Sequence, residues 1–424
     1  MLSSRPHVLI ISQIYPPDLG GSATRALNVA KGLIANGARV TVVAAFPHYP
    51  EGKIPTRYKW KPLVQDQEGQ VRVIRTFVPG LESKGMMQRL VLFLSFIISS
   101  LFALPLVRDI DAVFASNPQI LSAFPAKIYS KVSSSPLILN VDDLWPESLY
   151  DLGMLRSGPG QGAAESVARV AYSLADKIAP ISSGYVSVLR SKYGVPADRI
   201  VTVPGGVDLS MFPLSNTFAR KDGEFVVLYL GAFSPAYDFQ QVLKAAKLLE
   251  DEKDVRIVLQ GAGEVLAKVE KGTTALGLTN VTINGYVIPR QQAAGLMLAS
   301  DALLLPLSGL PNIELGFSSK IYEYQAAGKP IICCSNGNAA QYIETTGSGV
   351  RIMPGDYAAL AKAVRFLKQN PTIAEMMGRA GRSSVERNYS IESVGHSILE
   401  LVRGDGNVYD GRNSGTLEKG QPIS

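Results

Sequence analysis

The sequence predicts an α/β protein built from two doubly wound, Rossmann-like domains. Its 424 residues suit two domains rather than one, because a single hydrophobic core stops growing beyond roughly 250–300 residues. Hydrophobic residues make up 46% of the chain, which is enough to build ordered cores and excludes a disordered protein. Short apolar runs alternate with helix-length segments along nearly the whole chain, a pattern typical of parallel sheets covered by helices on both faces.

The first half of the chain contains seven runs that are predicted to be strands. The first, residues 7–12, is apolar and is followed by a polar, proline-rich turn. We interpret it as a buried strand, because it is too short for the apolar region of a signal peptide. Helix-length patterns occur between several of these runs, for example at 22–35 and 182–193. The other six predicted strands are 39–45, 71–76, 111–115, 137–141, 177–181 and 200–203.

A second cycle of strands and helices begins at residues 225–231, after a Pro/Gly-rich junction at 203–209. Renewed alternation after such a break marks a new domain. We therefore expect domains at 1–205 and 206–384, with helices at about 385–403 packing back on the first. The tail 404–424 is rich in Gly, Asp, Asn and Ser and is predicted to be disordered. Further predicted strands are 255–260, 281–284, 302–306, 330–334 and 349–353.

The charge, cysteine and histidine content of the chain limits the classes of partner and site that are expected. The chain carries 42 basic and 36 acidic residues, a formal charge of +6, which weakly favours anionic partners such as nucleotides or phospholipids. Nucleic-acid binding is not expected, because only one short basic stretch contains aromatic residues. The two cysteines, Cys333 and Cys334, are adjacent in an apolar strand, which indicates a reducing compartment. The three histidines lie far apart and no metal-ligand spacing occurs, so no metal site is expected.

Two glycines, Gly20 and Gly21, follow the first predicted strand and precede a predicted helix. Glycines at such a turn let the backbone approach a ligand, and the helix N-terminus can bind an anion; an ordinary tight turn explains them equally well. The dinucleotide fingerprint GxGxxG is absent. The segment Gly261-Ala-Gly263 follows a strand but lacks the third glycine, so a nicotinamide-dependent dehydrogenase is disfavoured.

The clearest chemical signal lies at residues 317–332, where two serines precede a short predicted helix that carries Lys320 and Glu323. A lysine at a helix N-terminus opposes the helix dipole unless an anion binds there too. We therefore predict a diphosphate site at Lys320, with Glu323 accepting hydrogen bonds from ribose hydroxyls. The alternative is a capping box, in which Glu323 reaches back to Ser319 or to nearby backbone.

The combination of these motifs resembles glycosyltransferase family 4, the group 1 transferases with a GT-B fold. The similarity spans about residues 5–402. Two further segments, 46–52 and 143–148, resemble the branch that contains bacterial L-fucosamine (FucNAc) transferases of surface-polysaccharide assembly. The features that carry the family resemblance occur in the order Gly20-Gly21, Val203-Pro-Gly-Gly-Val-Asp-Leu, Gly231 and Ser-Ser-Lys-Ile-Tyr-Glu-Tyr-Gln-Ala-Ala-Gly-Lys-Pro.

The resemblance implies that a nucleotide sugar, with UDP as the expected nucleotide, binds in a cleft between two Rossmann-like domains. It also implies sugar transfer with retention of configuration and without a metal. Glu323 corresponds to the residue on the donor ribose, and Lys320, Ser319 and Ile321 correspond to those at the diphosphate. The resemblance further assigns to the donor site Gly20 and Gly21 across the cleft, Gly231, Gly263, and Tyr286 and Val287 beside the base.

The sequence departs from the family pattern at two places. The family's Glu-x7-Glu pair requires an acid at position 315, where this chain has Leu315 and an acid one residue earlier, Glu314. The Arg and Lys that usually follow the strand before Gly231 are also missing from residues 231–238. Cationic groups stabilise a leaving nucleoside diphosphate when no metal does so. Lys320 and helix dipoles are therefore expected to supply most of this stabilisation.

Two acids, Asp142 and Asp143, follow the strand at 137–141, at the edge where doubly wound sheets place functional groups. We predict Asp143, and second Asp142, as catalytic groups that orient a substrate or accept the acceptor's proton. A turn capped by aspartates is an equally good explanation. Nearby Trp145 and Glu147 are candidates for the acceptor pocket, although a packed aromatic is the simpler reading of Trp145. His48 is a candidate for contact with the acceptor or donor, although a solvated loop histidine is the expected case.

An uncharged apolar run at residues 90–107 reaches the length of a membrane span. A true span would divide the first domain between two of its own strands, so the run is either a buried core helix or a helix in the membrane interface. Residues 51–62 combine four cations with Tyr58 and Trp60, which suits an anionic lipid surface. We therefore expect monotopic attachment to an anionic membrane through 51–62 and 89–108, on the cytoplasmic face of the plasma membrane.

The leading hypothesis is a metal-independent, retaining glycosyltransferase that acts on a glycan or a polyprenyl-diphosphate-linked acceptor and needs no cofactor. Two alternatives remain open. An NDP-sugar 2-epimerase shares the architecture but needs carboxylates for proton abstraction at C2 and uses no acceptor. A nucleotide-sugar-binding membrane protein without catalysis is the third reading, which the missing cations favour.

Overall fold

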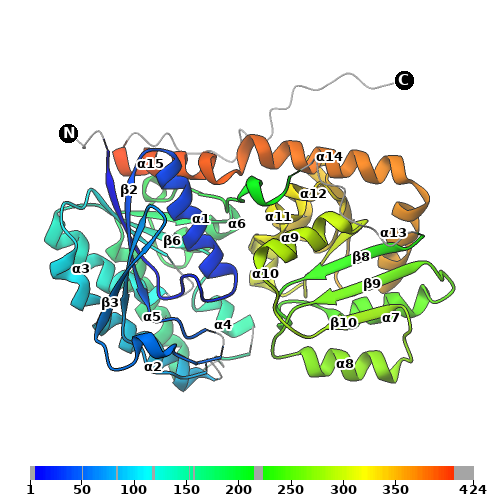
Figure 1. Ribbon diagram of the computed structural model, residues 1–424, viewed down its shortest axis with the longest axis horizontal. Helices are drawn as coiled ribbons and strands as arrows, with labels where there is room; N and C mark the ends of the chain where they lie inside the picture. The colour runs from blue at the N-terminus through cyan, green and yellow to red at the C-terminus, as the bar shows by residue number, and fades with distance from the viewer. Residues whose placement is uncertain are drawn as a thin grey trace. The chain divides into compact units, whose positions relative to one another are not determined.

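The structure is a computed structural model that describes residues 5–49, 51–82, 85–116, 120–151, 153–155, 158–213 and 223–404 (Figure 1). The chain separates into two units. Unit 1 comprises Met1–Glu147, Met154–Pro204 and Val394–Ser424, and unit 2 comprises Ser148–Gly153 and Gly205–Ser393. Most of the tail for which we predict disorder, residues 405–424, lies outside the described residues.

Unit 1 is built on a seven-stranded sheet with the strand order β3-β4-β2-β1-β5-β6-β7. Neighbouring strands are parallel except for the β3–β4 pair, which is antiparallel and lies at one edge. All five residues of the central strand β1 are buried, as expected for a strand covered on both faces. The strands are β1 (His7–Ile11), β2 (Arg39–Ala45), β3 (Leu63–Glu68), β4 (Val71–Thr76), β5 (Ala112–Ala115), β6 (Leu137–Val141) and β7 (Lys177–Pro180).

The helices of unit 1 come mainly from the first half of the chain, but the last helix of the described chain joins them. Val394, Ile398 and Leu399 of α15 lie in the same buried cluster as residues of α1. The two helices meet backbone to backbone, since a Cβ on Gly395 would lie 2.7 Å from the Cα of Gly32. These helices are α1 (Gly21–Ala35), α2 (Met86–Ser100), α3 (Ala123–Ser133), α5 (Pro159–Leu174), α6 (Gly184–Ser191) and α15 (Ile391–Arg403), while most of the short helix α4 (Glu147–Asp151) belongs to unit 2.

Unit 2 is built on a six-stranded, fully parallel sheet with the order β10-β9-β8-β11-β12-β13. Its strands are β8 (Phe225–Leu230), β9 (Val255–Gln260), β10 (Val281–Asn284), β11 (Ala302–Pro306), β12 (Ile331–Cys334) and β13 (Gly349–Ile352). Its helices are α7 (Phe239–Leu248), α8 (Leu266–Ala275), α9 (Arg290–Ala299), α10 (Pro311–Leu315), α11 (Lys320–Ala326), α12 (Asn338–Thr346), α13 (Tyr357–Gln369) and α14 (Pro371–Asn388). The predicted α/β class with two Rossmann-like units is confirmed.

Two elements of unit 1 differ from the sequence prediction. No element is predicted for residues 63–68, which form β3; an edge strand exposed on one side can be polar and shows no continuous apolar run. Residues 200–203 are predicted as a strand, but they run beside β7 through only two backbone bonds, Val201 N–H to Ile178 O and Val203 N–H to Pro180 O, and do not form a regular strand.

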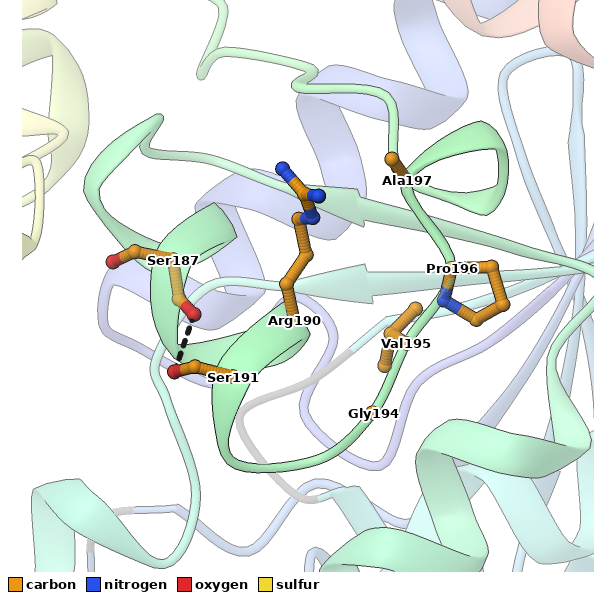
Figure 2. A pocket seen from close by; sticks show the side chains of 7 residues that line it. All are labelled: Ser187, Arg190, Ser191, Gly194, Val195, Pro196 and Ala197. Atoms are coloured by element: carbon orange, nitrogen blue, oxygen red, sulfur yellow. Dashed lines mark hydrogen bonds between the residues drawn. The ribbon is translucent and has the colours of Figure 1, made fainter.

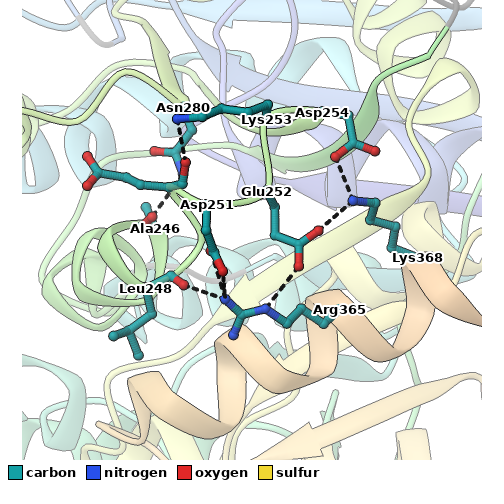
Figure 3. A network of polar contacts seen from close by, with 10 residues as sticks. Ala246, Leu248, Asp251, Glu252, Lys253, Asp254, Asn280, Arg365 and Lys368 are labelled. Atoms are coloured by element: carbon teal, nitrogen blue, oxygen red, sulfur yellow. Dashed lines mark hydrogen bonds and ion pairs between the residues drawn. The ribbon is translucent and has the colours of Figure 1, made fainter.

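A partly exposed ionic network joins α13 of unit 2 to the loop that follows α7 (Figure 3). The Arg365 guanidinium donates to Asp251 at 2.9 Å and to Glu252 at 3.1 Å. Lys368 donates to Glu252 and Asp254, each at 2.5 Å, and these hydrogen bonds lower the pKa values of both carboxyls. The network ties a loop of the scaffold to α13, so we regard it as a structural feature.

The apolar run of unit 1 forms α2 and the short 3-10 helix η2 (Leu101–Leu106). Within the described residues, Met86–Leu106 is long and apolar enough to span a membrane by length and composition alone. Only 28% of its most apolar 18-residue stretch is buried. Leu92, Phe96 and Ala103 point into the core. Exposed apolar side chains recur at helical spacing along the other face, at Met87, Val91, Leu94, Ile98 and Phe102. One face of this segment therefore packs into the core, and the opposite face exposes apolar side chains.

Candidate active site

In unit 2, Lys320 lies against the turn that follows β8. Its side chain crosses directly over Gly231, because a Cβ at that position would lie 2.6 Å from Nζ. Gly231 also has a φ of +148°, a conformation that L side chains rarely adopt. The Nζ donates a hydrogen bond to the Tyr237 hydroxyl at 3.0 Å and lies 5.0 Å from the centre of that ring. Gly231 and Lys320 therefore meet, and Gly231 is required for the path of the lysine side chain.

The helix α11 begins at Lys320, and its residues differ in what they can offer a ligand. Ser319 is exposed and makes no side-chain capping bond. The Ile321 side chain is buried, and its backbone N–H donates to Ser318 O at 3.1 Å. The Glu323 Oε1 accepts from Arg290 Nη2 at 3.1 Å. The capping box is therefore not formed, and Glu323 instead pairs with a cation from the start of α9.

The loops after β8 and β9 cross each other at glycines. A Cβ on Gly263 would lie 2.7 Å from the backbone nitrogen of Phe233, and Gly261 lies as closely on the backbone of Gly231. Both have φ values, +157° and +145°, that favour glycine. Gly263 is nevertheless exposed on its open side. The spacing GxG here reflects the close packing of two loops at the carboxyl edge of the sheet.

Tyr286 and Val287 follow β10, and their side chains are 60% and 48% exposed. The buried Gln260 side chain donates to the Tyr286 carbonyl at 2.6 Å and so fixes this segment. Glu314, the acid one residue away from the family position, accepts from Ser335 Oγ at 2.6 Å and from the Asn336 N–H at 2.8 Å. Glu314 thus holds the β12–α12 turn through one carboxylate oxygen.

In unit 1, Gly20 and Gly21 are exposed at the start of α1, and Gly20 has a φ of +114°. The preceding residue that fixes this turn is Asp18, which is buried. Its Oδ1 accepts from the backbone N–H groups of His48 and Tyr49, each at 2.8 Å, and so ties the β1–α1 loop to the loop after β2. Burial raises the pKa of Asp18.

His48 is 3% exposed, so the expectation of a solvated loop histidine is wrong. Its Nδ1 lies 2.8 Å from the Phe46 carbonyl and 3.9 Å from Asp18 Oδ2. Its Nε2 is buried without a hydrogen-bond partner, as is Asp18 Oδ2. The sequence shows a histidine between two prolines and cannot show that both the ring and its carboxylate partner are enclosed.

Asp142 and Asp143 differ in environment. Asp142 accepts from Asn140 Nδ2 at 2.8 Å and lies 3.6 Å from Arg25 Nε, and burial raises its pKa to about 6. Asp143 is exposed, and the surrounding protein raises the pKa of its carboxyl by desolvation. Asp142 is thus held by its neighbours, whereas Asp143 is accessible.

Other polar and aromatic residues of unit 1 have structural partners. Glu147 accepts from Lys192 at 2.7 Å and from the Tyr193 hydroxyl at 2.6 Å. The Trp145 carbonyl accepts from the Tyr172 hydroxyl at 3.3 Å. Asp111 precedes β5 at the opposite, amino edge of the sheet and accepts from the His7 N–H at 2.7 Å. These contacts favour structural roles for all three residues.

Three residues of these clusters were missed from the sequence. Arg25 is buried and donates to Asn140 Oδ1 at 2.9 Å across 115 positions of sequence, so no local pattern indicates it. Arg290 and Tyr237 lie near predicted site residues in the sequence. Their contacts, Arg290 with Glu323 and Tyr237 with Lys320, depend on how segments distant in the sequence pack together. The sequence did give one indication for Tyr237, because it lies in residues 231–238, where the Arg and Lys of the family pattern are missing.

An open depression of about 490 Å³ lies on unit 1, beside the C-terminal end of α6 (Figure 2). It is lined by residues between Ser187 and Ala197, with Arg190 its one ionisable side chain. The hydrogen bond drawn there, from Ser191 Oγ to the Ser187 carbonyl, is an ordinary contact within a helix. None of the predicted site residues lines this depression, so it is not a candidate for the active site.

Comparison with protein families identifies both halves of the chain. Residues 213–384 match the model described as glycosyl transferases group 1. Residues 20–206 match the model described as a glycosyl transferase 4-like domain. The two matches meet near the boundary between the units.

One relative that matches over nearly its whole length, and one that matches over about half, agree with these matches. The colanic acid biosynthesis glycosyl transferase WcaI of Escherichia coli K12 is 25% identical over 94% of this chain and 100% of its own length. The D-rhamnosyltransferase WbpZ of Pseudomonas aeruginosa is 34% identical over 48% of this chain and 53% of its own.

Solved structures share the fold. A sucrose-phosphate synthase from Thermosynechococcus elongatus superposes with a TM-score of 0.74 at 18% identity, covering 94% of this chain and 99% of its own. HepE from Anabaena, solved in complex with UDP and glucose, gives a TM-score of 0.65 at 16% identity over 93% and 99% of the two chains. The fold is therefore GT-B, as expected. Together with the family matches, this shows that the chain belongs to the group 1 glycosyltransferases of family 4.

Proposed function

We propose that the protein transfers a sugar, with retention of configuration, from a UDP-linked donor to a lipid-linked or glycan acceptor in surface-glycan synthesis. The observation that carries the proposal is the position of Lys320, whose ammonium group crosses Gly231 at the end of β8, one helical turn before Glu323. A cation beside exposed loops at the carboxyl edge of a parallel sheet suits a diphosphate. UDP is the first candidate because HepE was solved with UDP and glucose.

The charges of unit 2 support this assignment. Lys320 supplies one positive charge near the β8 turn, and Arg290 offsets the charge of Glu323 at 3.1 Å. Without Arg290, the carboxylate proposed to bind the ribose would repel a neighbouring diphosphate. In the proposed complex, Lys320 and Ser319 bind phosphate oxygens, Glu323 accepts from the ribose hydroxyls, and the segment at Tyr286 and Val287 contacts the base. Gly263, Gly231 and Ile321 shape this site through backbone packing.

The residues of unit 1 are proposed to serve the acceptor and the chemistry. Asp143 is exposed at the carboxyl edge of the sheet, which suits a group that takes a proton from the attacking hydroxyl. Asp142 is held by Asn140 and Arg25 and is assigned a supporting role. Gly20 and Gly21 are proposed to approach the donor phosphates from unit 1. We expect the reaction to need no metal ion, so activity should persist in EDTA.

The first test is a binding panel of UDP, GDP, ADP and TDP, followed by transfer assays with UDP-GlcNAc and UDP-FucNAc, each with and without lipid acceptor. Lys320→Ala should weaken binding of the preferred nucleotide about 10- to 100-fold, because a charge-assisted contact is lost. Lys271→Ala, a change at an exposed lysine of α8, is the matched control. The proposal fails if wild-type protein binds no nucleoside diphosphate, and acceptor-independent conversion of the donor would indicate 2-epimerisation instead.

We also propose that unit 1 binds an anionic membrane on its cytoplasmic side, where a polyprenyl-linked acceptor would be found. Val91, Leu94 and Ile98 on the outer face of α2 are 44%, 48% and 62% exposed. Trp60 is fully exposed between two exposed lysines, in the segment whose Pro62 carbonyl binds the Phe77 N–H at the end of β4. Apolar side chains beside lysines and a tryptophan suit the headgroup layer of anionic lipids.

Vesicle binding tests the membrane proposal. Leu94→Glu with Ile98→Glu should abolish sedimentation with phosphatidylglycerol vesicles, while Val132→Glu, at a 66% exposed position on α3, should leave it unchanged. If wild type, the double variant and Val132→Glu all bind vesicles at 0.05 M salt and none of them binds at 0.5 M, the attraction comes from the cations alone. Equal sedimentation of the double variant and wild type would contradict a role for α2.

A further inference from the structure

The Lys320 ammonium is positioned by one described partner. Its hydrogen bond to Tyr237 Oη is 3.0 Å long, and among the described residues no carboxylate forms an ion pair with it. An ammonium group has three N–H donors, and this bond uses one of them. Lys320 is therefore a half-buried cation whose counter-charge is not supplied by the described part of the chain.

Tyr237 is held firmly in the place where it meets Lys320. Its ring packs edge-on against Tyr229, with centroids 5.3 Å apart, and its backbone N–H donates to Ser234 O. The flanking residues tie the loop to the end of β11, through Asp238 N–H to Pro306 O at 2.8 Å and Ser308 N–H to Ala236 O at 2.9 Å. The hydroxyl position is therefore set by the scaffold before any ligand binds.

The direction of the hydrogen bond decides what Tyr237 can do next. An ammonium group can only donate, so the Tyr237 oxygen is the acceptor in this pair. The hydroxyl proton must then point to another acceptor, and accepting a bond from a cation makes a hydroxyl a stronger donor. Lys320 and Tyr237 together thus present more hydrogen-bond donors than acceptors beside the bare backbone of Gly231.

We propose that Tyr237 is a diphosphate-binding residue, which donates its hydroxyl proton to a phosphate oxygen while it holds Lys320 for a second oxygen. This inference rests on the proposed function and names a residue that makes the site prefer a nucleoside diphosphate over the nucleoside. Tyr237 does so without adding charge, in a segment that has no lysine or arginine between Gly231 and Asp238.

The test is a set of calorimetric titrations of wild type, Tyr237→Phe, Lys320→Ala and the double variant with UDP, UMP and uridine. Tyr237→Phe keeps the ring and removes only the hydroxyl, so it should weaken UDP binding about tenfold or more and leave uridine binding unchanged. The double variant should bind UDP only slightly more weakly than Lys320→Ala, because the two residues act together. Tyr357→Phe, at a 40% exposed position on α13, is the control.

The outcomes separate this inference from the proposed function. Equal UDP affinities for Tyr237→Phe and wild type overturn the role of Tyr237 and leave the glycosyltransferase proposal intact. Equal losses for UDP and uridine also overturn it, because they would show a general change in the site. If wild type binds none of the three ligands and none of the other nucleoside diphosphates, both proposals fail together.

Discussion

The two sheets end in very different surroundings, although both are parallel and doubly wound. At the carboxyl edge of unit 1, charged and polar side chains are buried in pairs, with Asp18 beside His48 and Asp142 beside Arg25. At the same edge of unit 2, glycine backbones cross and one lysine is held by a tyrosine. The edge of unit 2 therefore presents glycine backbone and a positive charge. The edge of unit 1 instead contains ionisable side chains whose protonation depends on their burial.

The comparison teaches that the same topology can carry very different side chains at its carboxyl edge. Burying an ionisable group costs free energy unless neighbours compensate for the lost water. Unit 1 leaves Asp18 Oδ2, His48 Nε2 and Asp142 Oδ2 buried without a hydrogen bond. Such incompletely satisfied groups are typical of sites where a function offsets a loss of stability.

The largest effect is expected at the most deeply buried cation of unit 1. Arg75 is fully buried and pairs with Glu68 at 2.7 Å and Asp66 at 3.4 Å. Arg75→Ala should lower the free energy of unfolding by about 3–5 kcal/mol, because it leaves Glu68 without its cation and Asp66 with Arg57 alone. Urea denaturation measures this. Lys368→Ala in the partly exposed network of unit 2 should cost only a small part of that, and equal losses would remove the contrast between the units.

The next effect is a pH dependence of stability that belongs to Asp142. Its pKa of about 6 exceeds the ordinary value of 3.8, so the folded state binds this proton more tightly than the unfolded state. The stabilisation is complete below about pH 4 and is lost as the pH rises through 6, by up to about 3 kcal/mol. The stability difference between wild type and Asp142→Asn should follow this course in urea titrations from pH 4 to 7.5. A constant difference would show that Asp142 does not titrate there.

A third prediction separates chemistry from donor binding. Asp143→Asn should lower kcat about 100-fold or more, because it removes the proposed proton acceptor, and should leave nucleotide affinity within about twofold. Steady-state kinetics and calorimetry on the same preparation measure both quantities. A larger loss of kcat for Asp142→Asn than for Asp143→Asn would exchange the roles of the two acids. A loss of nucleotide affinity without a loss of kcat would place Asp143 on the donor side.

The smallest effect is expected for the exposed pair of unit 2. Arg290→Ala frees Glu323 from its partner and should raise the donor KM about two- to fivefold, with kcat unchanged, because partly exposed ion pairs contribute little. Arg256→Ala, which removes a comparable pair with Glu224 away from this site, is the control. An increase above 50-fold would mean that Arg290 itself contacts the donor.

The sequence was sufficient for the fold class and for most strands, because buried parallel strands are continuous apolar runs. It was not sufficient for β3, whose polar residues lie on an exposed edge. The placement of Lys320 and Glu323 on one helix could be predicted from local spacing. Their partners could not, since Tyr237 lies in a loop 83 residues away and Arg290 at the start of α9, 33 residues away. The enclosure of His48 likewise depends on Asp18, 30 residues earlier.

The contact of Gly395 with Gly32 packs a helix that is synthesised late, α15, against one that is synthesised early, α1. The core of unit 1 takes Val394, Ile398, Leu399 and Val402 from a helix that the ribosome makes after all of unit 2. The core of unit 1 is therefore incomplete until α15 has been synthesised. A truncation before Val394 would leave the chain of unit 2 intact and yet should destabilise unit 1, whose other residues are made first.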